Sequence, residues 1–190
     1  MRIAIVGHGP SLKGKGLGKE IDSFEKVVRL KGSGSVLGTP DYGKKTDAVC
    51  ASTEIMGTFF KIHSDEYWAY PKKGVFNIGG VMDAITRLEK PVMVPLEHCN
   101  YWNNRFRQMG SCHPNVSTGM AAILISIKRW YPKEIVLFGF DTLMNPKTSF
   151  DRNDKIPRSG DGPYPNHDWG KENHLLTVLQ NVYKVSISAA

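Results

Sequence analysis

Length, composition and charge set the first limits on this chain. It has 190 residues, of which 41% are hydrophobic and 23% are charged, and this predicts a single globular domain, residues 1–190, whose core needs neither disulfides nor metals. The three cysteines, Cys50, Cys99 and Cys112, form no CxxC pair, which argues against a disulfide framework. With no signal-peptide pattern and no apolar run of membrane-spanning length, we expect a cytoplasmic protein, bacterial or viral, with no membrane partner.

The charge balance points to the kind of partner. An excess of 25 Lys and Arg over 18 Asp and Glu gives a net charge of +7, which favours an anionic partner such as a nucleotide, a nucleic acid or an acidic glycan. The basic residues are spread along the chain without forming a tract, so an ordinary solvated surface is the alternative interpretation. The oligomeric state is not predicted.

Strand and helix patterns alternate along the chain. In chain order we predict a strand at Arg2–Val6, strands at Lys26–Leu30 and Asp47–Ala51, a helix at Glu54–His63, a strand at Gly74–Ile78, a helix at Val81–Glu89, a strand at Pro91–Val94, a helix at Ser117–Trp130, a strand at Glu134–Phe138, a long loop at Asn145–Pro165 and a helix at Asp168–Val182. The alternation predicts an α/β fold, with a Rossmann-like, open and mainly parallel sheet that carries helices on both faces.

In such sheets ligands bind at the carboxyl ends of the strands. Three short segments follow predicted strands there, and one predicted helix begins with Ser-Thr-Gly, where free backbone N–H groups and the helix dipole favour an anion. Glycine at the helix start would let a phosphate approach the backbone closely. The candidate nucleotide-binding residues are therefore Gly7, His8, Gly9, Pro10, Ser11, Ser52, Thr53, Ser117, Thr118, Gly119, Gly139, Phe140 and Asp141.

Three stretches resemble the motifs of sialyltransferases. VGHGPSLKGKGLGKEIDSFEKVVRL, continued by YGKKTDAV at Tyr42–Val49, is similar to the long sialylmotif with its Gly-Asn-Gly turn and Val-x-Arg stretch. HPNVSTGMAAILISIKRWYPKEIVLFGFD, at His113–Asp141, resembles the short sialylmotif. NHDWGKENHLL, at Asn166–Leu176, resembles the last motif, in which a His precedes a Glu on a helix.

The resemblance implies a GT-A variant that takes a sugar from a cytidine monophosphate (CMP) carrier, inverts the anomeric centre and uses no metal cofactor. It implies that the Gly7–Ser11 turn and Arg29 contact the nucleotide, and that Ser117–Gly119 hold phosphate or sugar oxygens. His167 would accept the acceptor proton or donate to the leaving phosphate, a role that suits a side chain titrating near neutral pH. Further candidate catalytic residues are His174 and Glu172.

The chain also departs from the motifs. His8 stands where the family usually has Asn, and Lys31 ends the stretch that usually reads Arg-x-Asn. The membrane anchor and the paired motif cysteines have no counterpart here. These departures leave the identity of the sugar open.

Other interpretations remain open at the level of sequence. The acceptor hydroxyl could belong to a glycan or, given the net charge, to modified DNA. Alternatively, the chain is a non-catalytic nucleotide-binding module, or a pyrophosphokinase-type enzyme that would need magnesium. The spacing of His98, Cys99, Cys112 and His113 matches no zinc pattern, there is no Asp-x-Asp, and Tyr101, Trp102 and Phe106 suit core packing better than base stacking.

Overall fold

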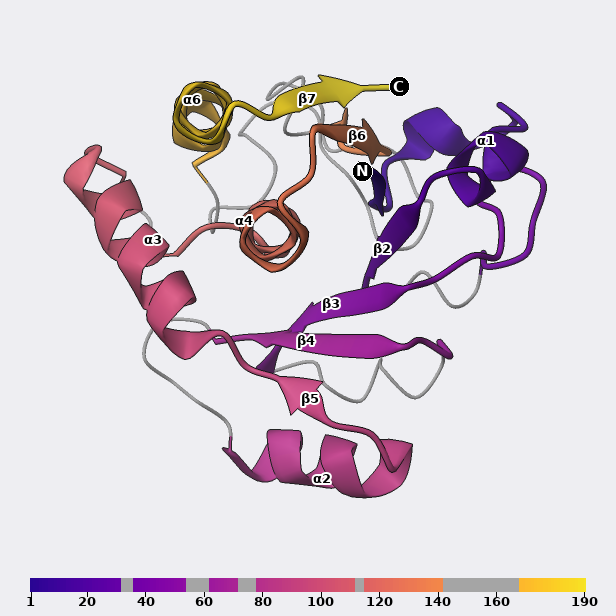
Figure 1. The fold of residues 1–190 in the computed structure, drawn as a ribbon, viewed down its shortest axis with the longest axis horizontal. Coiled ribbons are helices and arrows are strands. Elements are labelled where there is room, and N and C mark those ends of the chain that lie inside the picture. The colour runs from indigo at the N-terminus through magenta and orange to yellow at the C-terminus, as the bar shows by residue number, and fades with distance from the viewer. Residues whose placement is uncertain (32–35, 54–61, 72–77, 112–114, 142–167) are drawn as a thin grey trace.

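A seven-stranded sheet, parallel at every pairing, forms the centre of the molecule (Figure 1). The computed structural model describes residues 1–31, 36–53, 62–71, 78–111, 115–141 and 168–190. The strand order is β5-β4-β3-β2-β1-β6-β7. The strands are β1 (Arg2–Val6), β2 (Lys26–Leu30), β3 (Ala48–Ser52), β4 (Glu66–Tyr70), β5 (Val92–Met93), β6 (Glu134–Phe138) and β7 (Ser186–Ala189).

Helices cover both faces of this sheet. One face carries the longer helices, which are α3 (Leu96–Gln108), α4 (Thr118–Trp130) and α6 (Trp169–Tyr183). The other face carries α1 (Gly18–Asp22), the 3₁₀ turn η1 (Pro10–Leu12) and α2 (Ile78–Leu88). The predicted α/β class, with a parallel sheet and helices on both faces, is confirmed.

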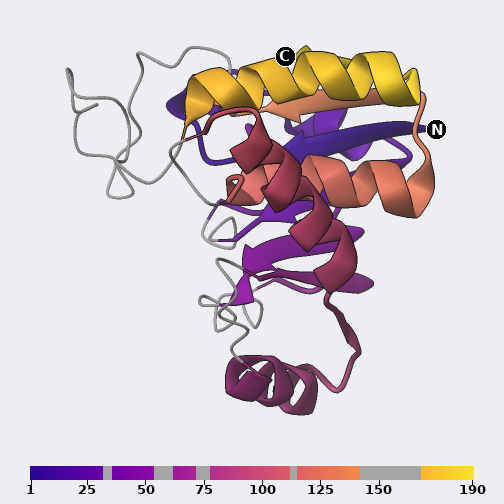
Figure 2. The same cartoon turned by 90° about the vertical axis from the view of Figure 1, so that its left-hand side faces the viewer.

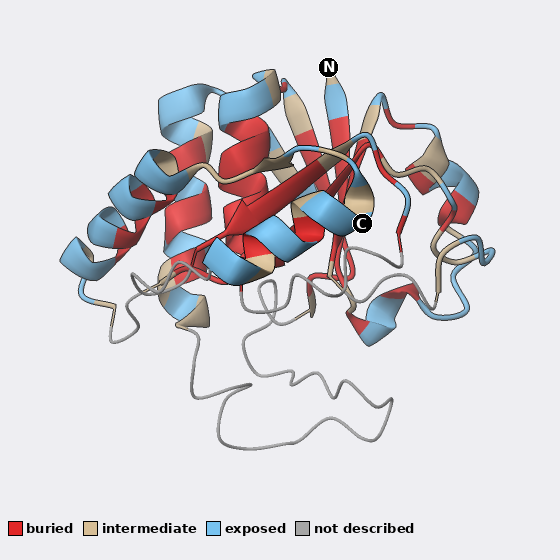
Figure 3. Ribbon diagram, turned by 90° about the horizontal axis from the view of Figure 1, so that it is seen from below, coloured by how far each residue is buried: buried red, intermediate tan, exposed pale blue. Residues whose placement is uncertain are grey.

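Burial is deepest where α4 lies on the sheet (Figure 3). Every residue of α4 from Thr118 to Ile127 is buried, and the same core cluster includes side chains of α3, α6 and the strands. Successive side chains of a strand point to opposite faces. Because Cys50 packs on the α4 side while Val49 and Ala51 pack on the α2 side, Ser52 points toward α4.

Several predicted elements are confirmed. Strands form at Arg2–Val6, Lys26–Leu30 and Glu134–Phe138 as predicted, and the strand predicted at Pro91–Val94 is the shorter β5. The helix predicted at Ser117–Trp130 is α4 with Ser117 as its N-cap. The helix predicted at Asp168–Val182 is α6 with Asp168 as its N-cap.

Other predictions need correction. The strand predicted at 47–51 lies one residue later, and α2 begins three residues before the predicted Val81. The strand predicted at 74–78 is wrong at Ile78, which opens α2, and the chain forms β4 at Glu66–Tyr70 instead, a strand that was not predicted. Residues 54–61, 74–77 and 145–165 lie outside the described part of the chain, while Ile62 and His63 are not helical.

The strand order reverses direction beside β1. The chain adds β2, β3, β4 and β5 on one side of β1, and it adds β6 and β7 on the other. The carboxyl ends of β1 and β6 therefore form the topological switch point, where open parallel sheets bind their ligands. The helices α4 and α6 begin at this same end of the molecule (Figure 2).

Candidate functional site

The turn after β1 is held directly against the end of β6. The backbone N–H of Gly7 donates to the carbonyl of Phe138, and that of Gly9 donates to the carbonyl of Gly139, both at 2.8 Å. A Cβ on Gly7 would lie 2.5 Å from the Gly139 carbonyl oxygen, which is closer than real Cβ atoms come. Glycine is thus needed at position 7 for the approach of two backbones.

Asp141 closes the same turn from the other strand. One of its carboxylate oxygens accepts a hydrogen bond from the backbone N–H of Ser11 at 3.0 Å. A Cβ on Gly9 would lie 2.5 Å from that carboxylate. The structure therefore brings together two predicted segments, Gly7–Ser11 and Gly139–Asp141, with the half-buried His8 inside the first.

The start of α4 lies next to this turn. The Ser117 hydroxyl caps the helix by accepting from the Met120 N–H at 3.1 Å. A Cβ on Gly119 would lie 2.7 Å from Cε1 of the Phe140 ring. The side of Gly119 that lacks a side chain is therefore occupied by Phe140, while the first N–H groups of the helix, including that of Thr118, stand at the carboxyl edge of the sheet.

A buried carboxylate anchors the helix start from α6. Glu172 has 0% of its surface exposed, and it accepts from both the backbone N–H of Ser117 and the Ser117 hydroxyl, the latter at 2.7 Å. Burial raises the pKa of Glu172 to about 7, the hydrogen bonds from Ser117 act in the opposite direction, and the charge of Asp168 raises it further. Ser117 and Glu172 thus form one unit, although 55 residues separate them.

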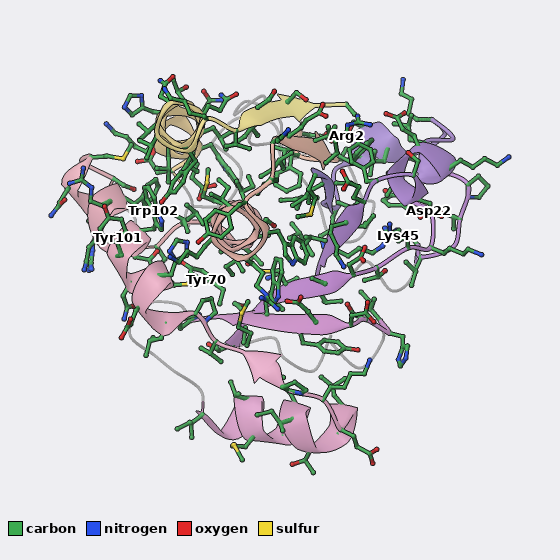
Figure 4. All side chains as sticks on the ribbon, viewed as in Figure 1. Arg2, Asp22, Lys45, Tyr70, Tyr101 and Trp102 are labelled. Atoms are coloured by element: carbon green, nitrogen blue, oxygen red, sulfur yellow. The ribbon has the colours of Figure 1, made fainter. Side chains whose placement is uncertain are left out.

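A second anchor holds the residue before Ser117. The side-chain oxygen of Asn103, on α3, accepts from the Val116 N–H at 3.1 Å and from the Tyr70 hydroxyl at 2.8 Å. All three residues are buried, and Figure 4 shows Tyr70 reaching from the sheet toward α3. Sequence reasoning missed Tyr70 and Asn103; the available signal was the Asn103 amide beside Trp102 in a helix whose buried face also holds Phe106.

Two hydroxyl groups at the end of β3 are buried at the same edge. Ser52 is 0% exposed and Thr53 is 1% exposed. Neither hydroxyl has a hydrogen-bond partner among the residues that the structure describes. Because an unpaired buried hydroxyl is costly, and because Ser52 points toward α4, these hydroxyls are available to polar atoms of a ligand.

Arg29 lies on a different side of the sheet from α4. Its side chain is 0% exposed, and its Nε donates to the Lys45 carbonyl and the Thr46 hydroxyl, both at 3.0 Å. Asp22 is an ion-pair partner at 3.9 Å. Burial lowers the pKa of Arg29 to about 10, and the charge of Asp22 opposes that effect. The residue braces the segment at Lys45 against α1, where Figure 4 shows Asp22 and Lys45 together.

The candidate catalytic residues have different placements. His167 lies outside the described residues, His174 is exposed on α6, and Glu172 is buried. The described contacts of Glu172 are to Ser117, and its catalytic role is untested by them. The catalytic role of His167 and His174 stays a prediction.

Three aromatic residues of α3 were interpreted as core. Trp102 and Phe106 are buried in the main core, which confirms that interpretation, whereas Tyr101 is 55% exposed and packs edge-on against Trp102 (Figure 4).

The described residues hold no group of three His, Cys, Asp or Glu side chains placed to bind a metal. Cys112 and His113 lie outside the described residues, and His98 is within 3.1 Å of the Leu124 carbonyl. Within the described ranges, no helix is long and apolar enough to cross a membrane.

The first part of the chain matches the model of a known protein family. The family model of glycosyltransferase family 29 (sialyltransferase) matches residues 1–75, which include β1 to β4. No curated protein gives a significant match.

Solved structures match along nearly the whole chain. A mammalian sialyltransferase has a TM-score of 0.58 and 19% identity, over 98% of this chain and 68% of its own. The sialyltransferase CST-II, solved with a trisaccharide acceptor and CMP, has a TM-score of 0.65 and 15% identity, over 100% of this chain and 80% of its own. A further structure of CST-II with CMP has a TM-score of 0.66 and 17% identity. The first 75 residues thus match the sialyltransferase family model, and the chain as a whole shares its fold with solved sialyltransferases.

Proposed function

We propose that the chain is a glycosyltransferase that transfers a sugar from a CMP-linked donor to an acceptor hydroxyl. The observation that carries the proposal is the start of α4, which is fixed beside the glycine turn at the switch point of the sheet. A helix start at this edge binds anions through its free N–H groups and its dipole. The donor phosphate would lie there, and the hydroxyls of Ser52 and Thr53 would meet polar groups of the nucleotide.

The comparisons support the choice of carrier. The matching family model is that of sialyltransferases, and structures of the same fold were solved with CMP and with a trisaccharide acceptor. A CMP-linked sugar as donor and a glycan as acceptor are therefore the first substrates to test.

The reaction that we propose is a single in-line displacement. The acceptor oxygen bonds to the anomeric carbon while the bond from that carbon to the phosphate oxygen breaks, and CMP leaves with inversion. His167 takes the proton of the acceptor hydroxyl. The N–H groups of α4 stabilise the charge that develops on the leaving phosphate, the task that a metal ion performs in other transferases, so we propose a metal-independent reaction.

A panel of nucleotides tests the proposal directly. Thermal unfolding is measured with CMP, CDP, UDP, GDP, AMP, and ATP with magnesium. A ligand at about 100 times its Kd stabilises the folded state by about 2.7 kcal/mol. Stabilisation by CMP without metal, followed by turnover of a CMP-linked sugar, supports the proposal. Stabilisation only by another nucleotide, or only by ATP with magnesium as a pyrophosphokinase would show, overturns it.

Two further hypotheses concern the acceptor and the presence of catalysis. A nucleic-acid acceptor is favoured only by the net charge of +7, and it predicts that activity on DNA falls steeply with salt.

A non-catalytic nucleotide-binding module is favoured by His8 and Lys31, which stand where the motif usually has Asn. The substitution His167→Ala distinguishes an enzyme from a binding module. An enzyme loses turnover in this variant and keeps its affinity for CMP, whereas a binding module has no turnover to lose.

A further inference from the structure

The contact between Glu172 and Ser117 uses every polar atom of both side chains. The two carboxylate oxygens of Glu172 accept from the Ser117 N–H and the Ser117 hydroxyl. The Ser117 oxygen also accepts from the Met120 N–H. While Glu172 is ionised, the one hydrogen of the Ser117 hydroxyl is therefore committed to the carboxylate, and Ser117 has no donor left for a ligand.

Protonation of Glu172 reverses this hydrogen bond. A carboxylic acid donates through its own O–H, so Glu172 would donate to the Ser117 oxygen, which has two lone pairs for Glu172 and Met120. The Ser117 hydroxyl hydrogen is then free to turn toward an acceptor outside the pair. The backbone N–H of Ser117 still has the second Glu172 oxygen as its partner, so the helix start stays anchored in both states.

The same proton also changes the charge beside the helix start. An ionised Glu172 places a negative charge next to the N–H groups that would bind a phosphate, in a buried region where water screens little. A protonated Glu172 removes that repulsion. Both effects have the same sign, since an anion at the start of α4 binds better when Glu172 is neutral.

We propose that Glu172 is a positioning residue whose protonation is coupled to the binding of an anionic, phosphate-bearing ligand at the start of α4. The ligand and a proton bind together: the proton comes from solvent to the Glu172 carboxylate, and the Ser117 hydroxyl turns from Glu172 to the ligand. This inference rests on the proposed function, because it takes the start of α4 as the phosphate site.

The groups around Glu172 allow this change near neutral pH. Burial raises the pKa of Glu172 to about 7, and Asp168, on the same helix, raises it further. From β4, the Tyr70 hydroxyl interacts electrostatically with Glu172; burial raises the pKa of that hydroxyl, so Tyr70 stays neutral. From α3 the neighbour of Tyr70 is the uncharged amide of Asn103. A phosphate arriving at α4 adds a further negative charge, which raises the pKa of Glu172 again.

The test is calorimetric binding of CMP to the full chain between pH 6 and pH 8.5, in two buffers of different ionisation enthalpy. Wild type is compared with Glu172→Gln and Ser117→Ala. We expect wild type to take up a fraction of a proton at pH 7 and to lose about 10-fold in affinity across the range, which corresponds to a shift of about one pKa unit. Glu172→Gln should show only the residual dependence that comes from the CMP phosphate itself. Ser117→Ala should take up fewer protons than wild type but more than Glu172→Gln, because it loses the hydroxyl and keeps the charge of Glu172.

The variant His63→Ala serves as the matched control, because a histidine side chain titrates in the same range and His63 is exposed outside the candidate site. This control should take up as many protons on CMP binding as wild type does. Equal proton uptake in wild type and Glu172→Gln overturns the inference while leaving CMP binding intact. If Glu172→Gln does not fold, Ser117→Ala is decisive, because proton uptake equal to that of wild type in this variant overturns the coupling through the Ser117 hydroxyl. No CMP binding to wild type at any pH overturns the proposed function itself, and the linkage with it.

Discussion

Two carboxylates stand at the same edge of the sheet and make the same kind of hydrogen bond. Asp141 accepts from the N–H of Ser11 in η1, and Glu172 accepts from the N–H of Ser117 at the start of α4. The first contact is exposed, whereas Glu172 is 0% exposed. Water can replace a lost partner at Ser11 but not at Ser117. The comparison teaches that burial, rather than the hydrogen bond as such, decides how much each carboxylate contributes to stability.

The largest expected effect on stability comes from removing the carboxylate of Glu172, and removal of the Asp141 carboxylate is the comparison. Glu172→Ala leaves the Ser117 N–H buried without its acceptor and opens a cavity, so we expect the free energy of unfolding to fall by about 3 kcal/mol. Asp141→Ala should cost about 1 kcal/mol or less, because solvent reaches Ser11. Urea denaturation of both variants measures the difference. Equal losses in the free energy of unfolding of the two variants would show that burial does not decide the contribution of each carboxylate.

The change in the free energy of unfolding with pH should be nearly as large as the effect of Glu172→Ala. The pKa of Glu172 is about 7 in the folded chain against 4.5 for the ordinary group, so the folded state binds more protons between these values. The contribution of Glu172 to stability is therefore present at low pH and declines as pH rises from about 4.5 to about 7, by roughly 3 kcal/mol in total. Glu172→Gln should remove this decline, and Asp141→Asn should keep it. Thermal unfolding across this range gives the measurement, and a decline that survives in Glu172→Gln would assign it to another group.

A smaller effect is expected where α4 meets Phe140. In Gly119→Ala the new Cβ would start 2.7 Å from the Phe140 ring, so the ring must move, and we expect a loss of about 1–2 kcal/mol together with weaker CMP binding. Gly170→Ala is the matched control, because the nearest atom to its Cβ is 3.8 Å away in the first turn of α6. That control should be neutral or stabilising by up to about 1 kcal/mol. Equal denaturation midpoints for the two variants would contradict the close contact.

The smallest effect is expected at the other end of α4. Arg129 pairs with Glu66 at 3.2 Å, and the two side chains are 52% and 26% exposed. Such a pair contributes below about 0.5 kcal/mol, so Arg129→Ala should barely change stability and should leave CMP affinity at the wild-type value. Denaturation and calorimetry on this variant sharpen the contrast between the two ends of one helix. A loss as large as that of Glu172→Ala would show that α4 is held as firmly at its exposed end.

Local signals account for what could be predicted from the sequence. The bounds of α4 follow from the Ser117 cap, the apolar spacing and the basic residues at its end, and the buried strands follow from short apolar runs. The strand β4 was missed because its sequence, EYWAY, combines a charge with aromatic residues and has no aliphatic run. The Gly7–Ser11 turn and Asp141 meet because parallel strands end at a common edge, which their positions in the sequence already indicated.

Long-range contacts account for what could not be predicted. Nothing near Ser117 in the sequence shows that its partner is Glu172, 55 residues away, or that Asn103 joins Tyr70 to the residue before the cap. The contacts of Arg29 with Lys45, Thr46 and Asp22 likewise depend on where α1 packs, and its contact with the nucleotide stays a prediction. Burial decided each of these roles, and burial is a property of the assembled fold.

The pairing of β1 with β6 has a consequence for synthesis of the chain on the ribosome. Arg2 pairs with Glu134 and Val6 with Phe138, so β1 receives its second neighbour only after β2, β3, β4 and β5 have all been translated. Until then the nascent chain can add β2 to β5 on one side while β1 keeps an unsatisfied edge, which is the type of surface that recruits other strands. The glycine turn cannot close before β6 arrives, so the nucleotide edge is completed late, and contacts of such long range are slow to form.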